Sequence, residues 1–171
     1  MLVRADALKQ AGGIEAIRGA LIDDCALAQQ LKTYGPIWLG LTERVRSIRP
    51  YPYIDDIRRM VSRSAYAQLR YSPLVLAGTV AGLVLTYLIA PMLAIFGTGL
   101  AQALGIATWG LMAVAFVPTL RFYAVSPLWG LALPAIACLY MLFTLDSAYQ
   151  YARGRGGAWK GRAQANLSDP S

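Results

Sequence analysis

The residues best suited to chemistry are two adjacent carboxylates, Asp23 and Asp24, in the segment 22–32. Two interpretations fit this pair. Acidic side chains at the start of a helix cap its free backbone amides and complement its positive end. In an active site, one carboxylate of such a pair acts as a general base while the other binds or orients a partner. Because the chain has no histidine and only two cysteines, Cys25 and Cys138, we expect no His/Cys zinc site.

The carboxylates lie in a polar block that precedes a long apolar region. Residues 1–70 contain eleven Lys/Arg and seven Asp/Glu, whereas residues 71–120 and 122–145 contain no charge. Uncharged apolar stretches of about 18 residues or more indicate transmembrane helices. With 57% hydrophobic and 15% charged residues, the composition argues against a soluble enzyme and indicates an integral membrane protein.

Three segments are candidate spans: 74–96, 100–120 and 128–145. Basic residues flanking a span usually lie on the cytoplasmic side. Because both polar blocks are net basic, we expect both to be cytoplasmic. Three full crossings would place the tail outside, so we favour an even number of crossings with one apolar segment re-entrant or interfacial. Gly78 and Gly82 have the small-xxx-small spacing that lets helices approach closely, although this spacing is also common by chance.

The polar block contains two kinds of predicted structure. Short helices at 5–10 and 22–32 precede an apolar run, Ile37–Leu41, which predicts a buried strand. From about Ile54 to Tyr71, apolar residues recur every three or four positions with arginines off the stripe. This pattern predicts a basic amphipathic helix, which lies in the membrane interface or packs on the soluble domain.

The first part of the chain resembles a family 2 glycosyltransferase. Ala7-Leu8, then Gly12-Gly13, then Ile22-Asp23-Asp24 follow a pattern found in that family. The pattern is an alanine-leucine pair, two glycines, and about ten residues later an acid-Asp pair that carries the catalytic base. The resemblance implies that Asp24 is the general base and that Asp23 stands where a Glu is more common.

Two further motifs support the resemblance. Gln68-Leu69-Arg70-Tyr71 resembles the Gln/Arg-x-x-Arg-Trp motif of processive and lipid-modifying members, with Ala67 at the Gln/Arg position and Tyr71 replacing Trp. Ala158-Trp159-Lys160-Gly161-Arg162 resembles the tail of membrane-bound members. In the order of its motifs and spans the chain is similar to hopene-associated glycosyltransferases. This resemblance implies a bacterial inner (plasma) membrane location.

The resemblance implies roles for the membrane-side residues. Arg70 would bind the departing diphosphate with its planar guanidinium, and Tyr71 or Trp159 would stack on the sugar or acceptor. From the residues alone, Arg70 is also explained as an arginine that snorkels to the interface. The tail motif is likewise explained as a headgroup-binding anchor. The substrate- or diphosphate-binding residues expected on the resemblance are Gln68, Arg70, Tyr71, Trp159, Lys160 and Arg162.

The resemblance also implies partners and a domain plan. The partners are a nucleotide-sugar donor, a lipid-type, hopanoid-related acceptor, and a divalent metal (Mg or Mn) in the full-length enzyme. The main metal ligands are expected outside this chain, because it has no Asp-x-Asp and no Gly-rich phosphate loop. We therefore expect the C-terminal portion of a longer enzyme, mainly α and membrane-integral. Its parts are a glycosyltransferase-A-type α/β remnant at 1–45, a link and interfacial helix at 46–72, two to three transmembrane helices within 73–145, and a basic cytoplasmic tail at 146–171.

Other functions are open from the sequence. A non-enzymatic membrane anchor or interaction subunit would use the basic helix and the apolar spans. A small transporter is less favoured, because the predicted spans contain no charge at depth. The arginines form no motif of a nucleic-acid-binding fold. We therefore expect membrane lipid, and not nucleic acid, as the partner of the basic surface.

Overall fold

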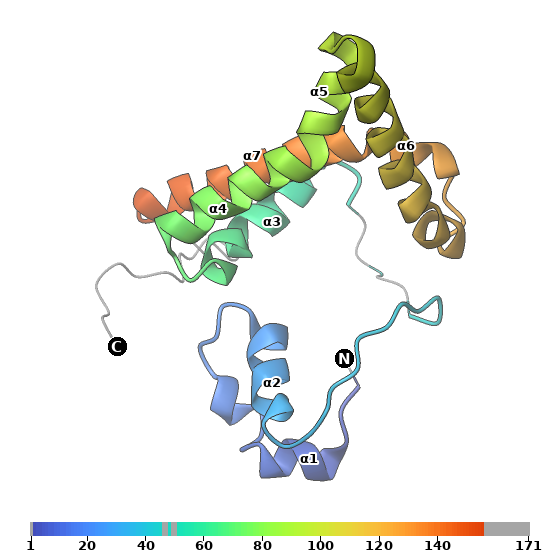
Figure 1. Cartoon of the computed structure of the whole chain (residues 1–171). Helices are drawn as coiled ribbons and strands as arrows, with labels where there is room; N and C mark the ends of the chain where they lie inside the picture. The colour runs from blue at the N-terminus through green and yellow to red at the C-terminus, as the bar shows by residue number, and fades with distance from the viewer. Residues whose placement is uncertain (1, 46–47, 49–50, 156–171) are drawn as a thin grey trace. The chain divides into compact units, whose positions relative to one another are not determined.

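The computed structural model describes residues 2–45, 48 and 51–155, and all regular secondary structure in these ranges is helical. The chain divides into two compact units, Met1–Pro50 (unit 1) and Tyr51–Ser171 (unit 2), which are described separately. Figure 1 shows unit 1 in blue and unit 2 in the colours from green to red.

Unit 1 consists of two short helices and one 3-10 turn. These are α1 (Ala5–Gln10), η1 (Glu15–Ile17) and α2 (Asp23–Lys32). Gly12 and Gly13 follow α1 with φ angles of 83° and 72°, a left-handed conformation that glycine adopts without strain. The N–H of Gly13 donates to the carbonyl of Leu8 at 2.9 Å and closes the end of the helix. The two predicted helices of this unit are confirmed.

The predicted strand at Ile37–Leu41 is wrong. This segment has no strand partner in the part of the chain that the structure describes, and its backbone forms no ladder. Trp38 and Leu39 are 94% and 99% exposed, not buried. A single extended segment cannot satisfy its own backbone donors and acceptors, so it forms a strand only beside another one. The α/β character expected for residues 1–45 is therefore absent from the described residues.

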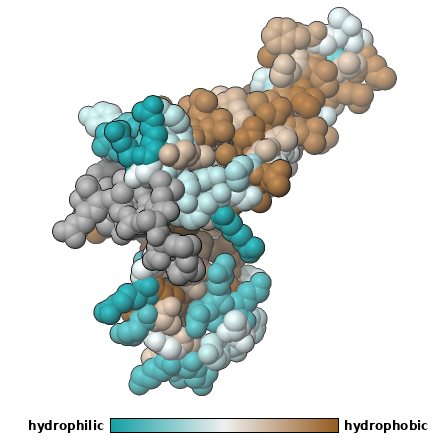
Figure 2. All heavy atoms as spheres, turned by 90° about the vertical axis from the view of Figure 1, so that its left-hand side faces the viewer, coloured by the Kyte–Doolittle hydropathy of each residue, from teal (hydrophilic) through white to brown (hydrophobic). Residues whose placement is uncertain are grey.

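Unit 2 contains one amphipathic helix and three long apolar ones. The helix α3 (Ile54–Gln68) follows the link, and its predicted start is confirmed. The candidate spans are Pro73–Phe96, Gly99–Phe122 and Pro127–Ala152, which confirms the three predicted segments to within a few residues except at the end of the third. Only 11–17% of their most apolar stretches is buried in the protein, and Figure 2 shows the apolar surface as a continuous brown region. These features support an integral membrane protein.

The first candidate span has an interruption. It consists of α4 (Pro73–Leu83), the π-helical turn η2 (Val84–Leu88) and α5 (Ile89–Phe96). Ser72 caps its start, because its Oγ accepts from the N–H of Val75 at 3.4 Å, and proline follows at the first helical position. Pro91 has no N–H to donate to the carbonyl four residues before it, and the turn there widens to a π-helix.

The remaining helices pack in pairs. The helix α6 (Gly99–Phe122) lies against α5 and then against the 3-10 turn η3 (Pro127–Ala132), whereas α7 (Leu133–Ala152) lies beside α3 and α4 (Figure 1). Gly105 lies in the contact between α6 and α5, and Gly130 in the contact between η3 and α6. No atom lies within 4 Å of a Cβ built at Gly78 or Gly82, so the small-xxx-small pair mediates no close contact in the described chain.

The partner of α3 within unit 2 was not predicted. This helix lies along the C-terminal half of α7, in the third candidate span. Its polar residues Arg58 and Ser62 face α7 instead of solvent. The reason is that α7 presents polar groups of its own, including Asp146, toward α3.

Candidate functional site

The two carboxylates of unit 1 accept hydrogen bonds from backbone amides in the first turn of helix α2. The N–H of Asp24 donates to Asp23 Oδ1 at 3.0 Å, and the N–H of Cys25 donates to Asp24 Oδ1 at 2.8 Å. Both side chains are exposed, and both lie in the first turn, where negative charge complements the helix dipole. The N-cap residue itself, Ile22, makes no side-chain cap, so the carboxylates act within the first turn, and each of them stays accessible to solvent.

A shallow, open depression lies beside this helix but does not include the carboxylates. Its volume is about 420 Å³. It is lined by residues of η1, α2 and the segments next to them: Ala16, Ile17, Arg18, Ala20, Ala26, Gln29, Gln30 and Thr33. Arg18 is the only charged side chain among them, so the depression offers a cation and no general base.

In unit 2, three tyrosines meet where α3 ends, α4 begins and α7 ends. The rings of Tyr71 and Tyr151 are stacked with centroids 4.4 Å apart, and Tyr66 packs edge-on against both at 5.7 and 5.4 Å. Burial in this cluster raises the pKa of Tyr71. The arginines Arg70 and Arg153 flank the cluster in the sequence. We call these five residues the tyrosine end.

The turn that carries Arg70 and Tyr71 is strained. Both residues have φ of 53°, a left-handed conformation that costs energy for residues with a Cβ. Their backbone N–H groups are nevertheless paired, with the carbonyls of Ala67 and Tyr66 at 3.0 and 3.1 Å. The turn reverses the chain between α3 and α4 and leaves the Arg70 side chain exposed.

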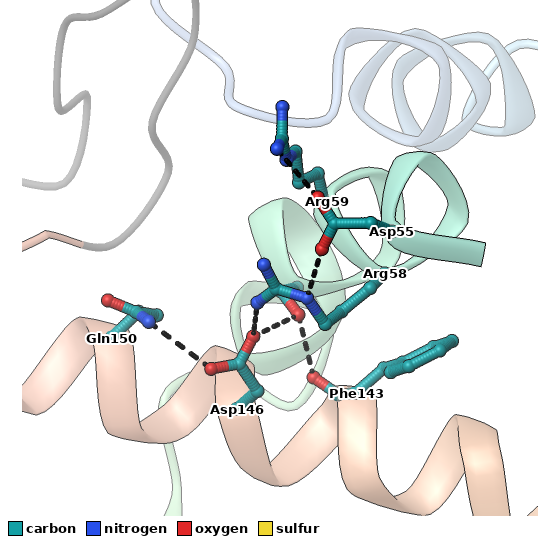
Figure 3. A network of polar contacts seen from close by, with 7 residues as sticks. Asp55, Arg58, Arg59, Phe143, Asp146 and Gln150 are labelled. Carbon is teal, nitrogen blue, oxygen red and sulfur yellow. Dashed lines mark hydrogen bonds and ion pairs between the residues drawn. The ribbon is translucent and has the colours of Figure 1, made fainter. Parts of the chain in front are cut away.

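A second polar cluster joins α3 to α7 (Figure 3). Asp146 Oδ2 accepts from Arg58 Nη1 at 2.7 Å and from Ser62 Oγ at 2.8 Å, while its Oδ1 accepts from Gln150 Nε2 at 3.2 Å. Arg58 Nε also donates to Asp55 Oδ1 at 2.8 Å. We call these five residues the polar clamp. Because the carboxylate of Asp146 has three donors, the cluster is built to hold the two helices together.

The electrostatics of the clamp follow from its ion pairs. The hydrogen bond from Arg58 lowers the pKa of Asp55, with desolvation as a weaker opposing effect. The pKa of Arg58 is raised, first by its hydrogen bond to Asp55 and then by the one to Asp146. Asp146 is the only acidic residue between positions 58 and 155. The charge on the rest of this part of the chain is therefore positive.

The predicted site residues are distributed over three places. Asp23 and Asp24 belong to unit 1, while Arg70 and Tyr71 belong to the tyrosine end of unit 2. Gln68 is exposed as the last residue of α3. The tail residues Trp159, Lys160 and Arg162 lie outside the described residues. Arg70 and Tyr71 lie together because they are neighbours in the sequence, so the predicted set as a binding site stays a prediction.

Sequence reasoning missed the polar clamp and the partner of Tyr71. One signal for the clamp was present, because Asp146 is the single charge between Arg121 and Arg153. Such an isolated acid beside a span requires a partner. No signal in the sequence indicated that the ring of Tyr71 stacks on that of Tyr151.

The described residues do not provide a metal site. Within the ranges 2–45 and 51–155 no three Cys, Asp or Glu side chains gather in a way that could bind an ion. Asp23 and Asp24 each use one oxygen on a backbone amide. We therefore assign no chemical step to a metal held by these residues.

Comparison with known proteins found no family model, no curated protein and no solved structure that matches this chain. The resemblance to glycosyltransferases therefore stays a prediction made from the motifs.

Proposed function

We propose that this chain is the acceptor-side and membrane portion of a membrane-bound glycosyltransferase. It would transfer a sugar from a nucleotide-sugar donor to a lipid-type acceptor, with hopanoid-related compounds as the class that the motifs favour. The observation that carries the proposal is the strained turn of Arg70 and Tyr71 immediately before the first candidate span. Strain of this kind at residues with side chains is typical of functional positions.

The proposed chemistry assigns one proton transfer to this chain. As the acceptor hydroxyl oxygen attacks the anomeric carbon, Asp24 takes the hydroxyl proton and the bond from that carbon to the diphosphate breaks. Asp24 Oδ1 already accepts from the N–H of Cys25, so its second oxygen is the one available for the proton. The nucleoside diphosphate leaves with the bonding electrons.

Arg70 would act on the leaving group. A guanidinium offers paired donors that match two phosphate oxygens, and its charge stabilises the negative charge that develops there. The exposed position of Arg70 next to the aromatic ring of Tyr71 suits a ligand with a phosphate and an apolar part.

The test uses membranes from cells that make the complete product of the gene. We expect Asp24→Asn to reduce sugar transfer to a lipid acceptor by about 10²- to 10⁴-fold, the usual contribution of a general base. Binding of the nucleotide sugar should be unchanged. The matched control is Asp6→Asn, an exposed acid of α1 whose carboxylate forms an ion pair with Arg4. Near-normal turnover of Asp24→Asn would remove Asp24 as the base.

Two further measurements define the contribution of this chain. Loss of transfer on Arg70→Lys would support paired phosphate contacts over simple charge. We expect the purified 171-residue chain alone not to bind a nucleotide sugar, because it lacks an Asp-x-Asp motif. Detection of donor hydrolysis or transfer by that chain would contradict this expectation.

One observation favours a different function, a non-enzymatic membrane anchor or interaction subunit. The Asp23 and Asp24 carboxylates bind the amides of their own helix and do not line the neighbouring depression. If this function is correct, Asp24→Asn has no effect on any transfer reaction. Its effect on the stability of α2 should be small, because an Asn oxygen can still accept from the backbone and only the charge that complements the helix dipole is lost.

A further inference from the structure

The contacts in unit 2 fix the relative directions of its helices. Arg58, near the start of α3, contacts Asp146, and Tyr66, near the end of α3, contacts Tyr151. The helices α3 and α7 therefore run in the same direction. The chain then reverses at the turn containing Tyr71, whose ring stacks on Tyr151. As a result α4 begins at the end of the structure where α7 finishes.

The pair formed by α4 and α7 is antiparallel along its length. α7 contacts both α4 and η2, and Figure 1 shows the two helices side by side. The uncharged part of the third candidate span, residues 127–145, is about as long as the hydrocarbon core of a bilayer is thick, at roughly 1.5 Å per residue. The last turns of α7, which carry the polar clamp and pack against α3, then lie at the level of the headgroups. The α5–α6 hairpin lies beyond η2, at the end away from the tyrosines. Hence α6 does not carry the chain to the opposite side before α7 begins its crossing.

The shared end of α4 and α7 has the composition of a membrane interface. The Arg153 guanidinium lies 4.6 Å from the centre of the Tyr149 ring, and Arg70 and Arg155 are exposed. Asp146, the only acidic residue between positions 58 and 155, is held by the polar clamp. Tyrosine rings are enriched at the level of lipid headgroups, and arginines bind their phosphates.

We propose that both ends of the apolar region emerge on the same face of the membrane, and that the tyrosine end binds the phosphate of lipid headgroups in that leaflet. Residues 153–155, which follow α7, then lie on the same side as the turn of Arg70 and Tyr71. This arrangement does not depend on glycosyl transfer. It agrees with the basic character of both polar blocks.

Cysteine labelling tests the topology. In a background with Cys25→Ser and Cys138→Ser, single cysteines are introduced at three exposed positions, as Gln68→Cys, Ala152→Cys and Thr98→Cys. A membrane-impermeant maleimide is applied to sealed right-side-out and inverted vesicles. We expect the first two variants to be labelled from the same side of the membrane. Thr98→Cys, between α5 and α6, should not be labelled from that side. Labelling of the first two from opposite sides overturns the proposal.

Cross-linking tests the same arrangement without vesicle orientation. A short bis-maleimide should join the cysteines of the double variant Tyr71→Cys/Tyr151→Cys, because the two rings are stacked. The control, Tyr71→Cys/Tyr123→Cys, pairs the same turn with the end of α6 and should not be joined. Equal cross-linking of both pairs, or of neither, contradicts the proposed antiparallel pair.

Lipid retention tests the headgroup site. The protein is purified from mixed phosphatidylglycerol and phosphatidylcholine, and the retained lipid is measured. We expect Arg70→Gln and Arg153→Gln each to lose about fivefold in retained phosphatidylglycerol. Arg121→Gln, an exposed arginine at the end of α6, should retain as much as the wild type. Equal retention by all three variants overturns the site, as does displacement of the lipid by millimolar inorganic phosphate, which would indicate a site for free phosphate.

Discussion

Units 1 and 2 differ in what holds their helices together. In unit 1 the buried side chains are Ala11 and Leu31, and Gln30 Nε2 donates to the carbonyl of Ala11 at 3.2 Å to join α2 to the end of α1. In unit 2 the link between α3 and α7 consists of an ion pair, several side-chain hydrogen bonds and the edge-on contact of the Tyr66 and Tyr151 rings. Unit 1 is therefore shaped mainly by local turns, and unit 2 by contacts between residues far apart in the sequence.

This difference has a consequence for mutations. A contact between distant segments is lost entirely when one partner is removed, whereas a local turn is maintained by several backbone hydrogen bonds. We therefore expect substitutions in the helix contacts of unit 2 to affect stability more than substitutions in unit 1. The following variants test this expectation, and each is measured as the free energy of unfolding by SDS titration in mixed micelles, except where stated.

The largest effect is expected at Gly105 in the α5–α6 contact. A Cβ there would lie 2.5 Å from the backbone nitrogen of Ala94 and 2.8 Å from the carbonyl oxygen of Ala90, and backbone atoms cannot move aside. Gly105→Ala should therefore separate the helices at a cost of about 3 kcal/mol. Gly110→Ala in the same helix has no atom within 4 Å and should gain up to about 1 kcal/mol. Equal stability of both variants would show that the close contact does not exist.

The next largest effect is expected in the polar clamp. Asp146→Ala removes the acceptor shared by Arg58, Ser62 and Gln150, and should cost about 2 kcal/mol because their donors lose a protein partner. Asp55→Ala removes a more exposed carboxylate, whose ion pairs are screened by water, and should cost clearly less. A loss of equal size for the two variants would indicate that α3 is not fixed to α7 through Asp146.

A smaller effect is expected at the tyrosine end. Tyr151 contacts two other rings, and Tyr151→Leu should lose about 1 kcal/mol of aromatic stabilisation. Its neighbour Tyr149 is half exposed and contacts Arg153, so Tyr149→Leu is the matched control and should change little. If both variants lose the same free energy of unfolding, the ring contacts of the cluster add no stability beyond the burial of apolar area.

The pH dependence of the clamp should be modest and has a definite sign. The pKa of Asp55 is lowered from 3.8 by its hydrogen bond to Arg58, so the unfolded chain takes up this proton first as the pH falls. The stability from Asp55 is therefore complete above its ordinary pKa and is lost as the pH falls through the lowered one. We expect the difference between wild type and Asp55→Ala to be constant near neutral pH and to vanish in acid. A difference that grows in acid would contradict this assignment.

The smallest effect is expected in unit 1. Trp38 is 94% exposed, and Trp38→Ser should change stability by less than about 0.5 kcal/mol. The informative result would be a loss as large as that of Tyr151→Leu. It would mean that Trp38 has a partner that the described chain does not supply, and the contrast between the two units would disappear.

The predicted elements were correct where local pattern determines structure. The uncharged stretches indicated the candidate spans because backbone hydrogen bonding and apolar surface leave few alternatives in a membrane. The helix α3 was predictable because apolar residues recur every three or four positions in the sequence from Ile54 onward. The strand at Ile37–Leu41 failed because a strand depends on a neighbour, which the pattern within five residues does not reveal.

The candidate site was predictable only in part, for a similar reason. The order of motifs selected Arg70 and Tyr71, and the structure brings them to one turn. Ser62 and Asp146 are 84 residues apart, so their contact depends on how α3 and α7 pack and not on any spacing in the sequence. The left-handed conformation of the turn could not be predicted from the sequence either, because neither residue is a glycine.

The π-helical turn at Val84–Leu88 gives one apolar segment two separate partners. An α-helix rotates by about 100° per residue, and a π turn holds one residue more than an α turn. The face that α5 offers to α6 is therefore turned relative to the face that α4 offers to α7. Loss of a single residue from this turn would rotate Ala90 and Pro91 away from α6 without changing the hydrophobicity of the segment. The exact number of residues in this turn thus determines how the α5–α6 hairpin is oriented relative to the antiparallel pair of α4 and α7.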